Sequence, residues 1–245
     1  MNTRMRADIL LVERGLFESR ARAQSAIAAG LVKANGALVA KPSSTLPADA
    51  EIDATLDHPY VSRGALKLEA ALEAFSIDPR DRICLDIGAS TGGFTDLLLK
   101  RGAKHVYAID VGRDQLHPSL RDDRRISSRE SCDARTLTKA DFSDAPSLIV
   151  IDVSFISLSL VLPHVLLLAA DHAQLVALIK PQFEAGRAAL KKGIVKDDAA
   201  RFESVEKIKA CIASLHWTVK GVIDSPIAGG DGNHEFLINA EFQAS

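Results

Sequence analysis

The chain has 245 residues, which suits one large domain or a large and a small one, and its 30 basic and 32 acidic residues exclude binding to nucleic acid through a strongly basic overall charge. Its three cysteines form no CxxC pair and leave one over in any pairing, which predicts reduced thiols in a cytoplasmic protein. The first residues carry only a brief apolar run, broken at Glu13 and Arg14, so we expect no secretory signal.

The front of the chain predicts a small α+β module. Two helices are expected over residues 6–14 and 20–29, each followed by a glycine, and Ser19 is placed to cap the second. A hairpin should follow over residues 31–39, because two short alternating runs there are joined by Asn-Gly. A further strand is expected near residues 50–52. Together these elements would form a domain over residues 1–58.

Positive charge is concentrated in this module, where seven basic residues face three acidic ones over the first 45 residues. Most charge runs are solvated faces. Arg20 and Arg22, however, open a helix whose N-terminus already favours anions, so contact with phosphate is a second interpretation. The order of helix, SRARAQSAIAAGLVKANG and hairpin resembles the S4 RNA-binding domain, which implies binding to structured RNA. The candidate RNA contacts in this module are Arg6, Arg20, Arg22, Lys33 and Lys41.

The remainder, residues 59–245, predicts a doubly wound α/β domain, because strands and helices alternate. A helix capped by Ser62 opens it. The last two strands have no helix between them and should pair antiparallel at an edge of a mainly parallel sheet. We expect strands near residues 82–86, 105–110, 125–128, 148–152, 174–180, 217–223 and 234–242, and helices near residues 92–101, 156–168 and 201–214.

The stretch Val153–Ala170 holds eighteen residues without a charge, which hydropathy alone would allow to span a membrane. It also contains three serines, Pro163 and His164, and it follows Asp152. We therefore interpret it as the end of a buried strand followed by a core helix.

A glycine-rich loop, DIGASTGG, joins the first strand of this domain to its helix. Its spacing lacks the G-x-G-x-x-G that seats a dinucleotide, and no Gly-Lys-Ser/Thr follows as a phosphate-binding P-loop requires. The D-x-G-x-x-x-G-G form that remains resembles the sites that bind S-adenosylmethionine (SAM). We predict SAM as the cofactor, no metal site, and contacts from Asp86, Gly88, Ser90, Gly92, Gly93 and Phe94.

Three acidic residues lie at or beyond the ends of three successive strands of this domain. Asp86 can face the cationic amino end of SAM, and Asp110, 22 residues beyond Gly88, can accept both ribose hydroxyls. Asp133 can bond the adenine amino group. For Asp110 and Asp133 the alternative is a role as a turn or helix-cap residue.

Two sequence features that other classes of methyltransferase require are missing, and their absence narrows the range of possible methyl acceptors. Methylation of pyrimidine C5 needs a nucleophilic cysteine, and no suitably placed thiol occurs. Methylation of base amino groups commonly uses a (D/N)PP(Y/F) tetrapeptide, whereas residues 152–155 read DVSF without the prolines. Lys180, in contrast, ends an apolar strand in ALIKPQFE, where a lysine is costly unless it is paired or used.

Four charged residues, Lys67, Asp152, Lys180 and Glu235, would gather at one rim if the sheet is wound as predicted. Their order resembles the K-D-K-E tetrad of FtsJ-like ribose 2′-O-methyltransferases. With the S4-like module in front, and with VSRGALKL, DIGASTGGF, DVSFIS, KPQFE, GIVKD and SPIAGGDGNHEF in order, nearly the whole chain resembles the TlyA family of RNA methyltransferases, also labelled haemolysin A.

The resemblance implies SAM-dependent methylation of a ribose 2′-hydroxyl in ribosomal RNA, free or in ribosomal subunits. It implies that Lys180 deprotonates or stabilises the attacking hydroxyl with Lys67 nearby, and that Asp152 and Glu235 orient the two ammonium groups, Asp152 also helping to hold SAM. Whether Lys180 is a general base or an electrostatic partner of the alkoxide stays open. The alternative for the tetrad is two surface salt bridges.

A basic, glycine-punctuated loop follows Lys180, and Arg63 lies near the predicted domain junction. A solvated loop is one interpretation, and an RNA clamp beside the site is the other. The candidate contacts are Arg63, Lys191 and Lys192, with Arg187 in the same loop. Two rival functions remain for the whole chain: a membrane-lytic haemolysin, and a non-catalytic RNA-binding or ribosome assembly factor.

Overall fold

The computed structural model describes residues 4–17, 20–54, 58–186, 189–229 and 232–244, apart from the side chains of residues 21 and 22. The chain divides into two compact units, Met1–Pro59 and Tyr60–Ser245. We call them the front unit and the second unit and describe each by itself. Ser19, predicted as a helix cap, and Arg187 lie outside the described residues, as does the side chain of Arg22.

The front unit contains the two predicted helices and the predicted hairpin, packed around one apolar core. At the tip of the hairpin Asn35 and Gly36 have φ values of 50° and 77°, the left-handed conformation that a tight two-residue turn requires. The strand expected near residues 50–52 lies two residues later. Strands β1 and β4 were not predicted, because these short runs pair with each other across a long stretch of chain and no tight-turn signal joins them. The elements are β1 Arg4–Arg6, α1 Ala7–Glu13, α2 Arg20–Ala28, β2 Val32–Ala34, β3 Ala37–Leu38, β4 Thr45–Pro47 and β5 Ile52–Ala54.

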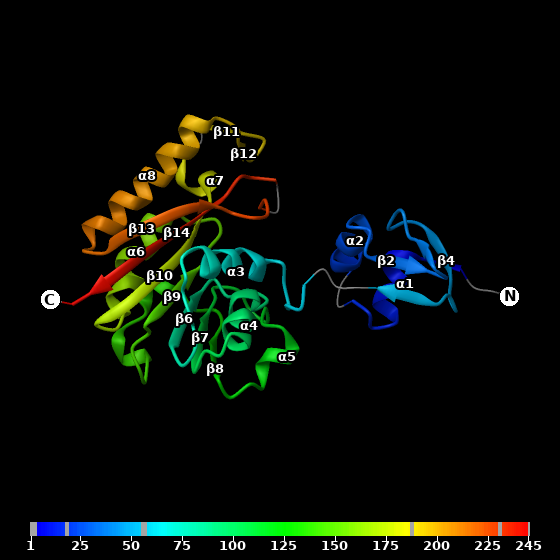
Figure 1. Cartoon of the computed structure of the whole chain (residues 1–245), viewed down its shortest axis with the longest axis horizontal. Helices are drawn as coiled ribbons and strands as arrows, with labels where there is room; N and C mark the ends of the chain where they lie inside the picture. Colours follow the sequence, from blue (N-terminus) through cyan, green and yellow to red (C-terminus); the bar gives the residue numbers. More distant parts are fainter. Residues whose placement is uncertain (1–3, 18–19, 55–57, 187–188, 230–231, 245) are drawn as a thin grey trace. The chain divides into compact units, whose positions relative to one another are not determined.

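The second unit is built on a seven-stranded sheet of order β13-β14-β10-β9-β6-β7-β8 (Figure 1). From β10 to β8 every neighbouring pair is parallel, whereas β14 runs antiparallel to both β10 and β13. The predicted doubly wound sheet with an antiparallel edge is thus confirmed. Its strands are β6 Ile83–Ile87, β7 His105–Ile109, β8 Ile126–Arg129, β9 Leu148–Ile151, β10 His172–Ile179, β13 Thr218–Asp224 and β14 Phe236–Gln243.

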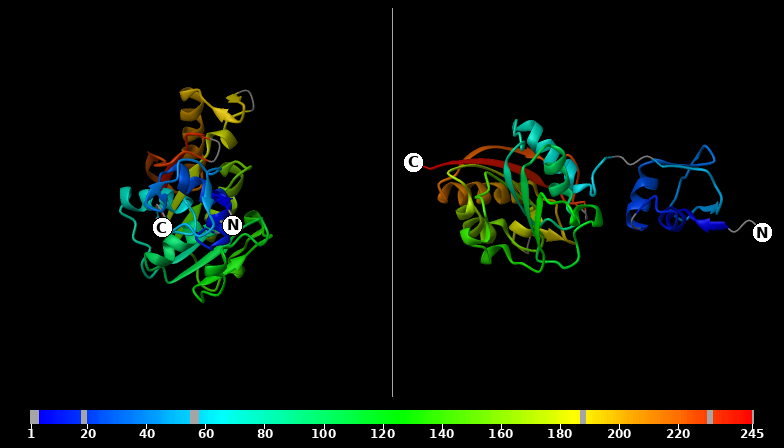
Figure 2. Two further views of the ribbon diagram at one scale, coloured as in Figure 1. Left: turned by 90° about the vertical axis from the view of Figure 1, so that its right-hand side faces the viewer. Right: turned by 90° about the horizontal axis from the view of Figure 1, so that it is seen from below.

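Helices cover both faces of this sheet. Apolar residues of α3 and α4 pack on one face, and those of α6 and α8 pack on the other. Figure 2 shows α3 and α8 on opposite sides of the strands when the molecule is turned. The helices are α3 Gly64–Ala74, α4 Gly93–Lys100, α5 Pro118–Arg121, α6 Leu158–Val165, α7 Pro181–Glu184 and α8 Asp198–Ser214, the 3-10 turns are η1 Ala134–Thr136, η2 Lys139–Asp141 and η3 Leu166–Leu168, and a small hairpin is formed by β11 Leu190–Lys191 and β12 Ile194–Val195.

Two details of the second unit bear on the predictions. The prediction that Ser62 caps α3 was wrong: Arg63 occupies the N-cap without a side-chain bond, and Ser62 instead lies against Gly93 at the start of α4. The apolar stretch Val153–Ala170 forms a loop, α6 and η3. No helix in the described part of the chain is both long and apolar enough to cross a membrane.

Candidate active site

The four residues of the predicted tetrad form two pairs at the carboxyl edge of the parallel strands. Asp152 directly follows β9 and Lys180 directly follows β10, while Glu235 directly precedes β14. Because Ile179 pairs with Phe236 across β10 and β14, Lys180 and Glu235 lie on adjacent strand ends. The fourth member comes from α3, whose apolar side packs with β14 in the same core.

The tetrad forms two short ion pairs. Nζ of Lys67 lies 2.6 Å from Oε2 of Glu235, with side chains 10% and 2% exposed. Nζ of Lys180 lies 2.6 Å from Oδ1 of Asp152, with side chains 11% and 23% exposed. These are not surface salt bridges, which contribute little stability; at this depth each charge depends on its partner, because an unpaired buried charge is strongly unfavourable.

Lys180 has a further partner that the sequence did not indicate. Its ammonium donates a hydrogen bond of 2.8 Å to Oγ of Ser154. The nearby Oδ1 of Asp152 faces the same ammonium but accepts no aligned hydrogen bond from any described residue. Lys180 is therefore held by a serine hydroxyl and by charge together. Ser154 stands where the DVSF segment departs from the proline-containing tetrapeptide, which was the only available signal.

A cavity of about 370 Å³ opens beside the Lys180 pair. Five of the predicted cofactor residues line it, together with Ser154 and Phe155. The carboxylate of Asp110 is held within it by two backbone N–H groups, those of Ser90 at 2.7 Å and Gly112 at 2.6 Å. The predicted residues in its lining are Gly88, Ser90, Asp110, Asp133 and Asp152.

Asp133 contributes to this lining in a different way from Asp110. Its carboxylate caps η1 through the N–H of Arg135 and also accepts hydrogen bonds from the guanidinium of Arg135. These bonds lower the pKa of Asp133 to about 2. Asp133 thus makes the contacts of a helix-cap residue, which was the alternative interpretation, and it also lines the cavity.

Four of the predicted cofactor residues, Asp86, Gly92, Gly93 and Phe94, are absent from this lining. The chain turns into α4 at Gly92, with a φ of 91°, and the next residues point toward α3 rather than toward the cavity. A side chain at Gly93 would lie 2.1 Å from Oγ of Ser62, and Phe94 belongs to the buried core. These residues are therefore close in sequence to the cavity-lining Gly88 and Ser90 but do not themselves line the cavity.

Asp86 lies in β6 and is fully buried. Its Oδ2 accepts a hydrogen bond of 2.7 Å from the hydroxyl of Thr95, whereas its Oδ1 has no partner among the described residues. Burial raises the pKa of Asp86 to about 7; the Thr95 hydroxyl opposes this shift and the nearby carboxylate of Asp152 adds to it. A buried acceptor without a partner is unfavourable unless a ligand or cation satisfies it.

Asp86 should make the stability of the second unit depend on pH. The unfolded chain releases this proton near pH 4 and the folded chain near pH 7, so the folded state binds more protons in between and the free energy of unfolding falls as pH rises from 4 to 7. The fall due to this group is on the order of 4 kcal/mol, and Asp86→Asn should remove it. Urea unfolding followed by the fluorescence of Trp217, the only tryptophan, would measure the effect; parallel pH curves for the two proteins would contradict it.

The predicted RNA contacts are basic residues of several elements. In the front unit, Arg6 and Arg20 both donate to the buried carboxylate of Asp8, each with a contact of 3.0 Å, and both remain about half exposed. The hydrogen bonds from Arg6 hold the pKa of Asp8 well below its usual range. One buried charge thus fixes two guanidinium groups whose remaining N–H donors are free to face solvent. The other described candidates are exposed: Lys33, Lys41, Arg63, Lys191 and Lys192.

Comparison with known families agrees with this architecture. The FtsJ-like methyltransferase family matches residues 60–242 of the chain, and the S4 domain family matches residues 5–52. Fold and site therefore define an FtsJ-like methyltransferase that carries an S4 domain.

Within that class, the chain belongs to the TlyA family. It is 44% identical over 241 residues to the 16S/23S rRNA (cytidine-2′-O)-methyltransferase TlyA of Mycobacterium tuberculosis, covering 97% of this chain and 90% of that protein. A solved structure from Streptococcus thermophilus, whose name contains the word hemolysin, is also 44% identical, with a TM-score of 0.79 over 100% of this chain and 90% of its own. A SAM-dependent methyltransferase from Mesorhizobium loti, 14% identical with a TM-score of 0.52 over 70% of this chain and 96% of its own, shares the fold alone. The resemblance inferred from the ordered motifs is confirmed.

Proposed function

We propose that this chain transfers the methyl group of SAM to the 2′-hydroxyl of a ribose in ribosomal RNA. The observation that carries the proposal is the pair of buried lysine–carboxylate contacts, drawn from four separate segments at the carboxyl edge of the sheet, where Asp152 of one pair also lines the cavity. The TlyA relative from M. tuberculosis, named for 2′-O-methylation of ribosomal RNA, supports the choice of substrate. We place the reaction in the cytoplasm, where ribosomes work and where three free cysteines stay reduced.

The residues around the cavity fit SAM. Each oxygen of the Asp110 carboxylate already accepts one backbone N–H, and because a carboxylate offers about four acceptor positions it can still accept two ribose hydroxyls. Asp86 does not line the cavity, but its buried Oδ1, without a partner among the described residues, lies two residues before the cavity-lining Gly88 and would favour the cationic amino end of SAM through its charge. Bound there, SAM supplies an electrophilic methyl group on a positively charged sulfur.

The chain's own residues then act on the ribose hydroxyl. Negative charge develops on the ribose oxygen as its proton is lost. In its neutral amine form Lys180 can accept that proton, and as an ammonium it can instead stabilise the charge, with Lys67 from α3 in support. The carboxylates of Asp152 and Glu235 fix both ammonium groups before substrate arrives, at 2.6 Å each. Such fixed geometry removes the cost of orienting the groups during the reaction.

An exposed aromatic side chain at the rim supports a nucleotide substrate. Phe155 is 91% exposed and has a φ of 65°, a strained conformation for this residue, next to Ser154 in the cavity lining. Its ring lies 5.3 Å from that of Phe183 on α7. Stacking of a nucleobase on an aromatic ring is worth about 1–3 kcal/mol, so covering this ring with a base would favour RNA over smaller alcohols.

The direct test is to incubate the protein with isotope-labelled SAM and ribosomal particles from a host that lacks the enzyme. We expect label in ribosomal RNA, mapped by mass spectrometry to a ribose 2′-O position. Label on a nucleobase would refute the proposed acceptor, and transfer to free RNA compared with assembled subunits would identify the substrate form.

The described residues offer no feature that favours the membrane-lytic alternative. Its one support in the sequence, Val153–Ala170, is accounted for by a loop, α6 and η3. A liposome leakage assay with the purified protein checks this: release of contents without SAM or RNA would revive the alternative. The non-catalytic alternative is tested by measuring methyl transfer in Lys180→Met and Lys180→Arg.

A further inference from the structure

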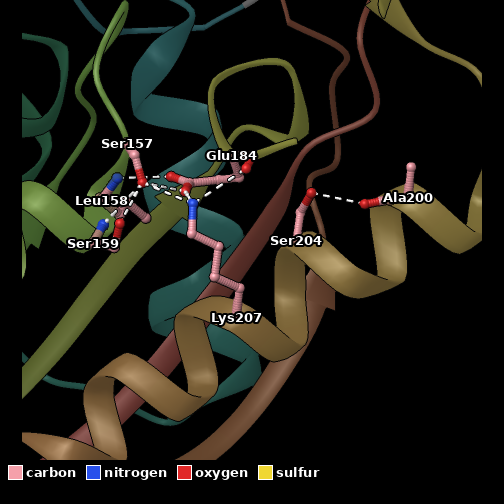
Figure 3. Close-up of polar contacts among 7 residues, drawn as sticks. All are labelled: Ser157, Leu158, Ser159, Glu184, Ala200, Ser204 and Lys207. Atoms are coloured by element: carbon pink, nitrogen blue, oxygen red, sulfur yellow. Dashed lines mark hydrogen bonds and ion pairs between the residues drawn. The ribbon is translucent and has the colours of Figure 1, made fainter. Parts of the chain in front are cut away.

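One buried carboxylate near the site has no part in the mechanism above. Glu184 is the last residue of α7, the short helix that begins directly after Lys180, and its side chain is only 1% exposed. Figure 3 shows it at the centre of a group of polar contacts that join three elements.

The contacts of Glu184 reach the start of α6 and one side of α8. Its Oε1 accepts the N–H of Leu158 at 2.7 Å, and its Oε2 accepts the hydroxyl of Ser157 at 2.5 Å. From α8, Nζ of Lys207 donates to the same Oε2 at 3.1 Å and to the backbone carbonyl of Glu184 at 3.2 Å. All of these partners are drawn in Figure 3.

These contacts close a ring around the reactive pair. The loop from Asp152 to Ser157 carries both partners of Lys180, Asp152 at one end and Ser154 two residues later. The other end of that loop, at Ser157, is bound by Glu184, four residues after Lys180 along the chain. The loop and α7 are thus joined at both ends, once through Lys180 and once through Glu184.

The need to cap α6 does not by itself explain why the buried residue at this place is the charged Glu184. Ser157 already caps α6, since its side chain accepts the N–H of Ser159. A neutral acceptor would complete such a cap without the desolvation of a carboxylate and without a lysine from another helix. What the buried pair adds is a fixed distance between α7, α8 and the loop.

We infer that Glu184, held by Lys207, is a positioning residue for methyl transfer. It fixes the 152–157 loop against α7, and this keeps Asp152 and Ser154 in contact with Lys180 and holds the Phe155 ring beside the cavity. The inference rests on the proposed function of the same site. A displacement of about 1 Å in such a constellation can cost 100-fold in rate, so kcat should fall even under conditions in which the variants remain fully folded.

The test uses the full chain with Glu184→Gln, Lys207→Met and Lys207→Arg. Lys209→Met is a matched control, because Lys209 lies two residues further along α8, is similarly exposed and is ion-paired with Glu206 at 2.7 Å. We expect Glu184→Gln and Lys207→Met to lower kcat at saturating SAM and RNA by about 10- to 100-fold. Lys207→Arg should restore most of the activity, and Lys209→Met should match the wild type.

Amide hydrogen exchange over residues 152–158 is the second measurement, and it needs no RNA. Exchange should speed up in Glu184→Gln and Lys207→Met and stay unchanged in Lys209→Met. The inference would be overturned if Glu184→Gln and Lys207→Met both kept the wild-type kcat, or if both left the exchange unchanged. If the wild type itself methylates no RNA, the proposed function fails instead, and exchange still decides whether Glu184 fixes the loop. Should Glu184→Gln not fold, the two Lys207 variants decide alone.

Discussion

Replacing Lys180 by methionine should lower kcat for methyl transfer by at least about 100-fold, the scale on which a positioned acid–base group contributes. Methionine keeps much of the length of the side chain and removes the ammonium, so the loss would report charge or proton transfer rather than a void. The affinity for SAM, measured by calorimetry, should stay close to that of the wild type, because the Asp110 side of the cavity does not depend on Lys180. Unchanged kcat would remove Lys180 from the mechanism and favour the non-catalytic alternative.

Lys180→Arg separates the two roles left open for this residue. A guanidinium keeps the positive charge but cannot release a proton at working pH. If Lys180 acts as an electrostatic partner of the developing alkoxide, arginine should recover part of the activity that methionine loses; if it acts as a general base, the two variants should be equally inactive. Lys209→Arg, on an exposed face of α8, is the control for the substitution itself.

The architecture of the second unit could be predicted because local signals agreed with one another. Apolar runs such as Leu148–Ile151 are buried on both faces, as a central parallel strand requires. In a parallel sheet the residue after each strand falls on one edge, so Asp152 and Lys180 could be placed together from their positions alone. Placing Lys67 and Glu235 at the same rim required the predicted winding of the whole sheet, because a helix and an antiparallel strand reach that edge only through tertiary packing; the ordered motifs of the family then supported the assignment.

The scattered placement of the motif residues has one physical origin. A motif is contiguous in sequence, but a tight turn sends its halves to different neighbours, so Gly88 and Ser90 face the cavity while Gly93 and Phe94 pack toward α3. For the same reason Ser154 was missed, since its role depends on how two loops approach each other. Contacts between segments far apart in the chain leave no periodic signal.

The front unit shows a similar limit for charge. Counting residues gives an excess of basic over acidic groups, yet the count cannot tell that Arg6 and Arg20 share one buried carboxylate. A shared partner restrains both guanidinium groups while cancelling only one of their two charges. Restrained cations lose less conformational entropy on meeting a phosphate, which fits the RNA binding that the S4 resemblance implies for this unit.

Gly88→Ala should abolish measurable binding of SAM and, with it, methyl transfer. A Cβ at this position would lie 2.3 Å from the backbone oxygen of Asp152 and 2.8 Å from its carbonyl carbon. Backbone atoms cannot rotate away as the end of a side chain can, so the end of β9 must move, and Asp152 with it. The φ of 83° adds a penalty of about 1 kcal/mol for alanine.

Gly193→Ala isolates the steric part of this effect. Gly193 has nearly the same φ, 81°, but an added Cβ would meet no atom within 4 Å. Both variants therefore carry a similar backbone penalty, and only one displaces a neighbouring strand. Calorimetric titration with SAM should show wild-type affinity for Gly193→Ala and no detectable binding for Gly88→Ala. Equal affinities would mean that the β6 and β9 ends can separate without harm, and the close approach at Gly88 would then have no part in shaping the cavity.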